Sequence, residues 1–255
     1  MEPATSQGKS EATENFPVAA RFLSRPHRAS VMAFYRAARA ADDIADDPDL
    51  PADEKVARLD ALAVEWLPSP HLAKLLQAFR QDATKTRYRD WSDLMLYCRF
   101  SAVPVGRFLL DLHGEGRAAY PAADALCTVL QVLNHLQDCG DDYRMLDRVY
   151  LPTAWMNAEG AQLADLGEGR TQPALRRVLD RALDRVDELL VQARPLSRQV
   201  ADRRLALQAA ITVAVAERLA QKLRRRDPLA SRVRLSKPGY AAACARGGLR
   251  WLLRR

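Results

Sequence analysis

Residues 121–143 read PAADALCTVLQVLNHLQDCGDDY, and this stretch decides the fold class. Its apolar residues include Val129, Val132, Leu133 and Leu136, which recur at helical spacing. A run of this length without β-type alternation is typical of one long, largely buried α-helix. The stretch therefore predicts a helical domain with this segment near its centre.

The flanking sequence has the same helical character. The 255-residue chain contains only 11 glycines and shows no convincing alternation of polar and apolar residues. Asp90 or Ser92 can cap a helix that Pro104 kinks. Further helices are predicted at residues 26–41, 52–67, 71–88, 173–194 and 200–226. We expect a disordered tail over residues 1–13 and one all-α domain of about eight to ten helices over 14–255, by the usual helix length.

A ladder of polar residues interrupts the apolar run at strict four-residue spacing: Asn134, Asp138 and Asp142. On a helix, residues four apart share a face, with about 5–6 Å between their Cβ atoms. An asparagine in an apolar run is costly unless it forms hydrogen bonds or binds a ligand. The ladder therefore predicts a polar site on the inner side of the helix.

A second acidic segment, ARAADDIADD at residues 38–47, lies about ninety residues earlier. Tyr35, Arg39, Asp42 and Asp46 follow one another at spacings of 4, 3 and 4, so they form one stripe of a helix. Taken alone, such a stripe fits a solvated acidic face as well as a binding site. Two ladders in one chain favour a shared site, because facing carboxylates repel each other unless a cation lies between them.

The cation that suits this donor set is magnesium (Mg²⁺), which takes oxygen ligands and is commonly bound by a few carboxylates together with substrate phosphates. The net charge of +7 also favours an anionic ligand or membrane surface. No zinc-finger spacing or RNP-like strand indicates a nucleic-acid partner. No GxGxxG or P-loop indicates a nucleotide.

Three further residues are candidates for the site. Arg148 and Tyr150 closely follow the second ladder and can donate hydrogen bonds to phosphate. Tyr97 lies in an apolar helix, where its ring can face a carbocation and its hydroxyl can orient a diphosphate. The alternatives are a surface arginine and two ordinary core tyrosines. The four histidines show no metal-ligand spacing.

Cellular location follows from several weaker signals. The four cysteines form no CxxC pair, which favours free thiols in a reducing cytoplasm. No uncharged apolar run approaches the roughly 20 residues needed to span a bilayer. Residues 239–255, GYAAACARGGLRWLLRR, are basic and amphipathic. They fit either a terminal helix docked on the domain or a peripheral contact with the inner face of the cytoplasmic membrane.

Four motifs together resemble the squalene/phytoene synthase family. They are YRAARAADDIAD, DLMLYCRFSAVPVG, NHLQDCGDDYR and DRVYLP, in that order and at family-like separations. The resemblance covers nearly the whole chain and implies an isoprenoid synthase-type helical bundle around a central cavity. Finer details are most similar to the bacterial members of the hopanoid pathway that convert presqualene diphosphate to hydroxysqualene.

The resemblance also implies roles for individual residues. The Mg²⁺ and diphosphate residues would be Asp42, Asp46, Asn134, Asp138 and Asp142. Diphosphate would also contact Arg39, Arg148 and Tyr150, and the reactive cavity would be lined by Tyr35 and Tyr97. Phenylalanines are further candidates for its wall, although each fits a plain core equally well: Phe16, Phe22, Phe34 and Phe100.

The chain departs from the wider family at three places. Asn15 and Phe16 stand where many members carry serines, SAVPVG replaces VAGxVG, and Gln137 replaces an arginine before the second acidic motif. These changes favour a narrower task than condensation of two farnesyl diphosphates. Two alternatives stay open: a head-to-head condensing synthase, and a non-catalytic subunit that binds neighbouring enzymes of squalene synthesis.

Overall fold

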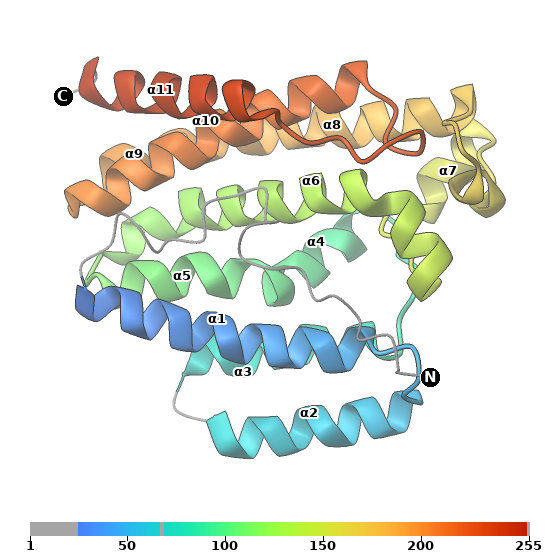
Figure 1. Ribbon diagram of the computed structural model, residues 1–255, viewed down its shortest axis with the longest axis horizontal. Helices are drawn as coiled ribbons and strands as arrows, with labels where there is room; N and C mark the ends of the chain where they lie inside the picture. Colours follow the sequence, from blue (N-terminus) through green and yellow to red (C-terminus); the bar gives the residue numbers. More distant parts are fainter. Residues whose placement is uncertain (1–24, 67–68, 254–255) are drawn as a thin grey trace.

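The computed structural model describes residues 25–66 and 69–253, which fold almost entirely into α-helices (Figure 1). The only β-pairing in these ranges is an isolated bridge between Arg87 and Val149. The all-α prediction is therefore confirmed. In chain order the α-helices are α1 (Arg25–Asp46), α2 (Ala52–Trp66), α3 (Pro70–Asp82), α4 (Trp91–Ser101), α5 (Val103–Leu112), α6 (Tyr120–Leu146), α7 (Thr153–Glu159), α8 (Pro173–Ala193), α9 (Leu196–Gln199), α10 (Arg203–Arg225) and α11 (Lys237–Leu253), with 3₁₀ turns η2 (Arg117–Ala119) and η3 (Leu163–Gly167).

Helix α6 is central because it is apolar on several sides. It packs against α4, α5, α8 and α10, and Figure 1 shows it running through the middle of the bundle. Its residues Val129, Val132, Leu133 and Leu136 are all at most 2% exposed. The stretch that predicted the fold class therefore forms the middle of the core.

Helix α1 carries the first acidic segment. It extends to Asp46, beyond the predicted end at residue 41, so the whole stripe from Tyr35 to Asp46 is helical. Pro48 and Pro51 follow its end, as expected for residues that cannot continue a helix. Helices α2 and α3 pack beneath α1 and fix its position.

Several predicted boundaries were wrong, and each has a local cause. Helix α3 ends at Asp82 instead of residue 88, because the following segment pairs with the chain after α6; the Val149 amide donates to the Thr86 carbonyl oxygen at 2.9 Å. Pro104 does not kink one helix: α4 ends at Ser101 and Pro104 lies in the first turn of α5.

The caps define the remaining boundaries. Asp90, not Ser92, is the N-cap of α4 and accepts a hydrogen bond from the Asp93 amide. Asp202 caps α10, so this helix begins at Arg203 instead of residue 200. In both cases the carboxylate accepts from amide groups that the first helical turn leaves unpaired.

Helices α10 and α11 form the outer layer at the top of Figure 1. They approach closely at Gly247, where an added Cβ would lie 2.6 Å from the Ile211 Cα atom. Ala243 and Gly247 of α11 are buried in this contact. The C-terminal segment therefore forms a helix docked on the domain through one face.

Candidate active site

A polar cavity of about 260 Å³ lies between α1 and α6. Both acidic ladders border it: Asp42 and Asp46 from α1, and Asn134, Asp138 and Asp142 from α6. The helices are therefore placed with their acidic faces toward a common space. Arg39, Tyr97, Arg148 and Tyr150, which the sequence also singled out, border the same cavity.

Arginines hold the carboxylates of α1. Arg39 donates to Asp42 at 2.9 Å and to Asp43 at 2.6 Å. Arg148 is only 5% exposed and lies 2.5 Å from Asp46. Burial alone lowers the pKa of Arg148, but nearby Tyr150, Asp82 and Asp46 outweigh this effect and raise it. Arg148 is therefore a fixed positive charge in the cavity wall.

A third arginine, Arg232, holds the second ladder, and the sequence analysis missed it. It pairs with Asp138 through two contacts of 2.7 and 2.8 Å. Gln137 points away from the cavity and donates to the carbonyl oxygen of Val233, next to this arginine. Where many family members carry an arginine, this chain thus has a glutamine that secures the loop presenting Arg232.

Asp82 is the second residue that the sequence analysis missed. It is 7% exposed at the end of α3 and accepts hydrogen bonds from Tyr97 at 2.7 Å and Tyr150 at 3.4 Å. Burial raises the pKa of Asp82 to about 7, although Arg148 opposes the shift. Because Tyr97 donates its hydroxyl hydrogen to Asp82, only its oxygen can act on a ligand, as an acceptor.

Aromatic rings close this side of the cavity. Tyr150 stacks on His135 with 3.5 Å between ring centroids, and Tyr97 lies 5.5 Å from Tyr150. Burial raises the pKa of both tyrosines, and the neighbouring Asp82 raises them further. Both hydroxyls therefore stay protonated at neutral pH and keep their hydrogen bonds.

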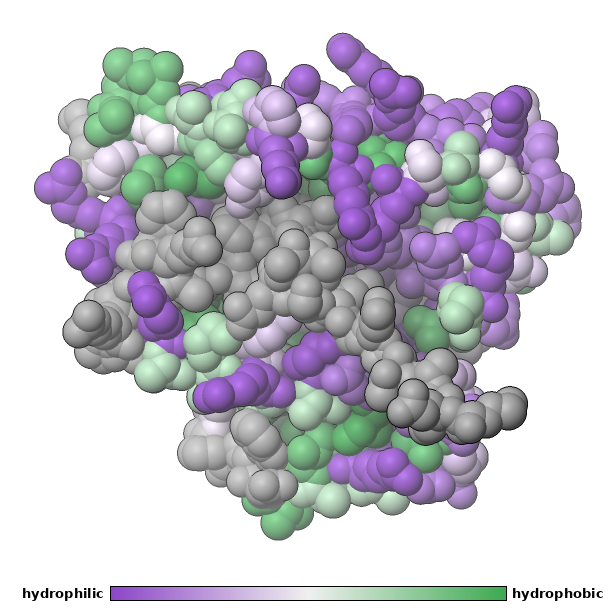
Figure 2. All heavy atoms as spheres, in the orientation of Figure 1, coloured by the Kyte–Doolittle hydropathy of each residue, from purple (hydrophilic) through white to green (hydrophobic). Residues whose placement is uncertain are grey.

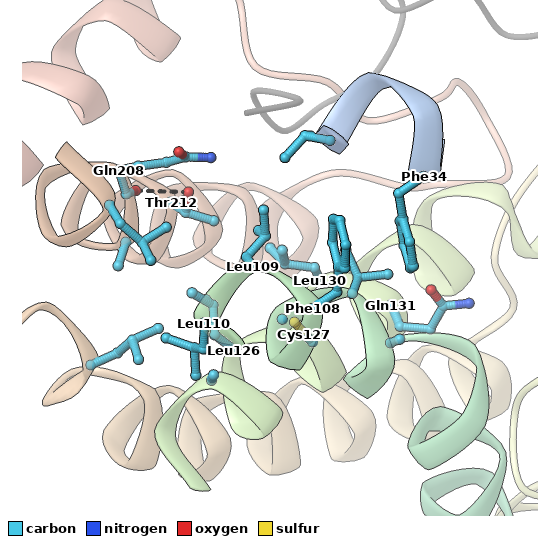
Figure 3. Close-up of a pocket in the computed structure, with 18 of the residues that line it drawn as sticks. Phe34, Phe108, Leu109, Leu110, Leu126, Cys127, Leu130, Gln131, Gln208 and Thr212 are labelled. Atoms are coloured by element: carbon cyan, nitrogen blue, oxygen red, sulfur yellow. Dashed lines mark hydrogen bonds between the residues drawn. The ribbon is translucent and has the colours of Figure 1, made fainter. Parts of the chain in front are cut away.

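A second cavity of about 330 Å³ adjoins the first and is apolar (Figure 3). Side chains of α1, α5, α6, α9 and α10 line it, among them Phe34, Phe108 and Leu130. Phe34 and Phe108 stack with 4.1 Å between centroids. Tyr35 borders this cavity and not the polar one. The space suits a hydrocarbon group larger than a single prenyl unit.

The two cavities meet at three polar residues. Ser101, Gln131 and Asn134 border both of them. Asn134 thus stands at the boundary, with the carboxylates on one side and the aromatic wall on the other. A ligand with an anionic head and a long apolar body can fill both spaces through this junction.

Not every predicted wall residue reaches a cavity. Phe100 packs against the main hydrophobic core and borders neither space, so its prediction as a cavity residue was wrong. An aromatic residue at helical spacing fits a core as well as a cavity, and sequence spacing does not separate the two. Phe16, Phe22 and the predicted tail over residues 1–13 lie outside the described residues.

The arrangement has oxygen ligands for a divalent cation without a complete protein cage. Within residues 25–66 and 69–253, no three His, Cys, Asp or Glu side chains gather closely enough to hold a metal by themselves. The carboxylates from two helices instead border a space large enough for a diphosphate. This fits Mg²⁺, which usually binds one or two carboxylates and completes its shell with phosphate oxygens and water.

Sequence comparison relates this chain to known enzymes. The family model described as squalene/phytoene synthase matches residues 10–66 and 59–239. A protein named hydroxysqualene synthase from Rhodopseudomonas palustris is 45% identical over 92% of this chain and 88% of its own length. Another of that name, from Zymomonas mobilis, is 40% identical over 96% of this chain and 92% of its own length.

Structural comparison agrees with the sequence. The crystal structure of squalene synthase HpnC from Alicyclobacillus acidocaldarius has a TM-score of 0.71 and 31% identity, over 84% of this chain and 90% of that one. A dehydrosqualene synthase with bound ligand has a TM-score of 0.78 at 22% identity, over 94% of this chain and 92% of that one, and shows the fold alone. With the helical bundle and both acidic motifs in place, the chain belongs to the squalene/phytoene synthase family.

Proposed function

We propose that this protein converts presqualene diphosphate to hydroxysqualene, by loss of diphosphate, rearrangement of the resulting carbocation and capture of water. The observation that carries the proposal is the direct junction of a charged cavity with an apolar one at Asn134. Two relatives named hydroxysqualene synthase, at 45% and 40% identity, support the choice of product.

The charged cavity would hold the diphosphate. Three arginines border it: Arg39, Arg148 and Arg232. Arg148 is buried, and nearby acidic groups raise its pKa. Buried guanidinium groups bind phosphate oxygens strongly, because they donate several hydrogen bonds in a fixed plane. Tyr150 adds a protonated hydroxyl to the same wall.

The same cavity would hold Mg²⁺, through the oxygen ligands of Asp42, Asp46, Asn134, Asp138 and Asp142. When bound, Mg²⁺ neutralises the diphosphate and stabilises the charge that builds up as the leaving group departs. Asp46 forms an ion pair with Arg148, and Asp138 forms one with Arg232. The protein residues thus supply both signs of charge around the leaving group.

The apolar cavity would contain the hydrocarbon part during rearrangement. The faces of Phe34, Phe108 and Tyr35 can stabilise positive charge through their π-electrons, and the surrounding Leu and Val residues keep bulk water out. Tyr97 borders the charged cavity, and its hydroxyl oxygen can accept a hydrogen bond there. The cation can then react against an apolar wall.

Incubation of the purified protein with Mg²⁺ and either farnesyl diphosphate or presqualene diphosphate tests the proposal. We expect hydroxysqualene from presqualene diphosphate and no product from farnesyl diphosphate. Turnover of farnesyl diphosphate alone would instead establish a head-to-head condensing synthase. Product formation in cells that survives both Asp42→Ala and Asp138→Ala would establish the non-catalytic subunit.

We also propose that α11 contacts an anionic membrane surface. Helix α11 turns an apolar strip outward, with Leu249, Leu252 and Leu253 at 56%, 61% and 77% exposure. In Figure 2, hydrophobic residues gather at the upper left, where the last turns of α11 lie in Figure 1. No helix in the described ranges has the length and hydropathy to cross a bilayer.

The charge distribution supports a lipid partner for this strip. Residues 202–255 contain fourteen Lys and Arg against three Asp and Glu, a formal charge of +11, whereas residues 1–201 carry −4. The three acids are Asp202, Glu217 and Asp227, and all accept hydrogen bonds within the domain. Exposed leucines flanked by cations are typical of surfaces that bind anionic lipids.

Sedimentation with vesicles tests the membrane contact. We expect the full-length protein to bind phosphatidylglycerol vesicles and not phosphatidylcholine vesicles. Joint substitution of Leu249, Leu252 and Leu253 by Ser should weaken binding about tenfold or more. Each substitution removes apolar area that the leucine would bury in the bilayer. Ser at Val64, Val191 and Leu163, which are also exposed, is the matched control. Equal binding by both triple variants would contradict the proposal.

A further inference from the structure

The wall of the apolar cavity contains a buried polar atom to which the proposed reaction assigns no role. The Gln208 side-chain oxygen, Oε1, is buried and has no hydrogen-bond partner among the described residues. Gln208 is 7% exposed and lies on α10. It borders the apolar cavity and not the charged one. Leaving such an atom unpaired costs free energy, so a ligand is expected there.

A second acceptor lies one helical turn away. The Thr212 hydroxyl donates to the backbone carbonyl oxygen of Gln208 at 2.9 Å, so its hydrogen is already used. Its oxygen therefore keeps lone pairs that can accept. Figure 3 shows Gln208 and Thr212 together on α10, across the cavity from Phe34 on α1.

The pair has the chemistry of a water site. Positions four apart share one face of a helix, and both residues border the same cavity, so one water molecule can contact both side chains. Buried waters occur where two to four polar groups would otherwise stay unpaired. Two acceptors take both hydrogens of such a water, so the lone pairs of its oxygen are free to face the cavity.

We propose that Gln208 and Thr212 bind the water molecule that adds to the rearranged carbocation. This inference rests on the proposed function. The water oxygen forms a bond to the cationic carbon, and one of its protons leaves. The released diphosphate, a base produced in the adjoining cavity, takes that proton. The product is the alcohol hydroxysqualene, with no oxidant or reductant consumed.

The site explains how an apolar cavity gives an alcohol. A carbocation in a fully apolar space ends its lifetime by losing a proton from a neighbouring carbon, which gives an alkene. A water held at one fixed place competes with that loss without flooding the cavity. Gln208 and Thr212 would therefore decide the product without affecting departure of the leaving group.

Product analysis of Gln208→Leu tests this assignment. With presqualene diphosphate and Mg²⁺, we expect the share of hydroxysqualene to fall at least about tenfold, with an alkene in its place, which corresponds to about 1.4 kcal/mol in product partitioning. Diphosphate release should change by less than threefold. Gln221→Leu, an exposed glutamine on the same helix, is the matched control and should give the wild-type product.

A second pair of variants keeps the test decisive if Gln208→Leu does not fold. Thr212→Val removes the acceptor oxygen and should shift product toward alkene, whereas Thr212→Ser keeps it and should restore alcohol. Wild-type product ratios in both Gln208→Leu and Thr212→Val would overturn the water site. Failure of the proposed function would differ, since the wild-type protein itself would then make no hydroxysqualene from presqualene diphosphate.

Discussion

The two cavities share a border of three residues but are built in opposite ways. In the charged cavity each arginine is paired with a carboxylate: Arg39 with Asp42, Arg148 with Asp46, and Arg232 with Asp138. In the apolar cavity, stacked and packed rings such as Phe34 and Phe108 set the shape. The first is organised by electrostatics and the second by steric fit.

The comparison shows how leaving-group departure and cation control can be separated. We expect the charge pairs in the first cavity to exchange partners when a diphosphate binds, because its oxygens compete with the carboxylates for the arginines. Apolar walls make no such exchange and keep their shape. We therefore expect substitutions in the charged cavity to change the rate, and substitutions in the apolar cavity to change which substrate fits and which product forms.

The largest effect is expected for Asp138→Ala. This variant loses a carboxylate next to the leaving group and frees Arg232, so diphosphate release should fall about a thousandfold, as for loss of one group that stabilises a transition state. Asp141→Ala, which removes an exposed neighbour on the same helix, should stay within about threefold of wild type. A loss below tenfold for Asp138→Ala would contradict the assigned role of this cavity.

A smaller and more selective effect is expected for Ala209→Phe, which fills part of the apolar cavity. Turnover of presqualene diphosphate should fall about tenfold or more, because the added ring would occupy space that the hydrocarbon part of the substrate needs. Binding of inorganic diphosphate with Mg²⁺, measured by calorimetry, should not change. Ala158→Phe, at an exposed position on α7, is the control. Equal loss of diphosphate binding would show that the cavities are not independent.

The last effect concerns stability and not turnover, through Asp82 in the wall of the charged cavity. Its pKa is raised to about 7 in the folded protein, so the folded state binds a proton more tightly than the unfolded state. The contribution of Asp82 to stability therefore falls as pH rises from about 4 to about 7. Asp82→Asn removes this dependence.

Urea unfolding at several pH values measures the effect. From pH 5 to pH 8, the unfolding free energy of Asp82→Asn should rise relative to wild type by roughly 3 kcal/mol, which is the linkage expected for a shift of this size. Asp141→Asn, at an exposed carboxylate, gives the baseline. A constant difference across this range would mean that Asp82 is ionised throughout in the folded protein.

Much of the fold and the charged site could be predicted from the sequence, because helical spacing converts directly into geometry. Asn134, Asp138 and Asp142 were expected on one face of a helix, and they border the same cavity as Asp42 and Asp46. Two ladders were needed to predict that the two helices face each other, since one ladder alone fits a solvated surface. Helix boundaries were less predictable, since tertiary contacts ended α3 early.

The residues that sequence analysis missed have no pattern of their own. Asp82 stands at a helix end, and only the fold brings it to Tyr97 and Tyr150. Arg232 lies in a loop 94 positions from its partner Asp138. Gln208 is one polar residue in an alanine-rich helix, and its importance depends on what surrounds it. Such residues are identified by burial and missing partners, which a sequence does not display.

The close crossing at Gly247 has a consequence for the variation of this enzyme. Any other residue there would place a Cβ atom 2.6 Å from Ile211 Cα and 2.8 Å from the Ala210 carbonyl oxygen. Those atoms belong to the same turns of α10 as Gln208 and Thr212. We therefore expect a substitution in the outermost helix to displace the inner wall and to alter product ratios from a position that contacts no reactant.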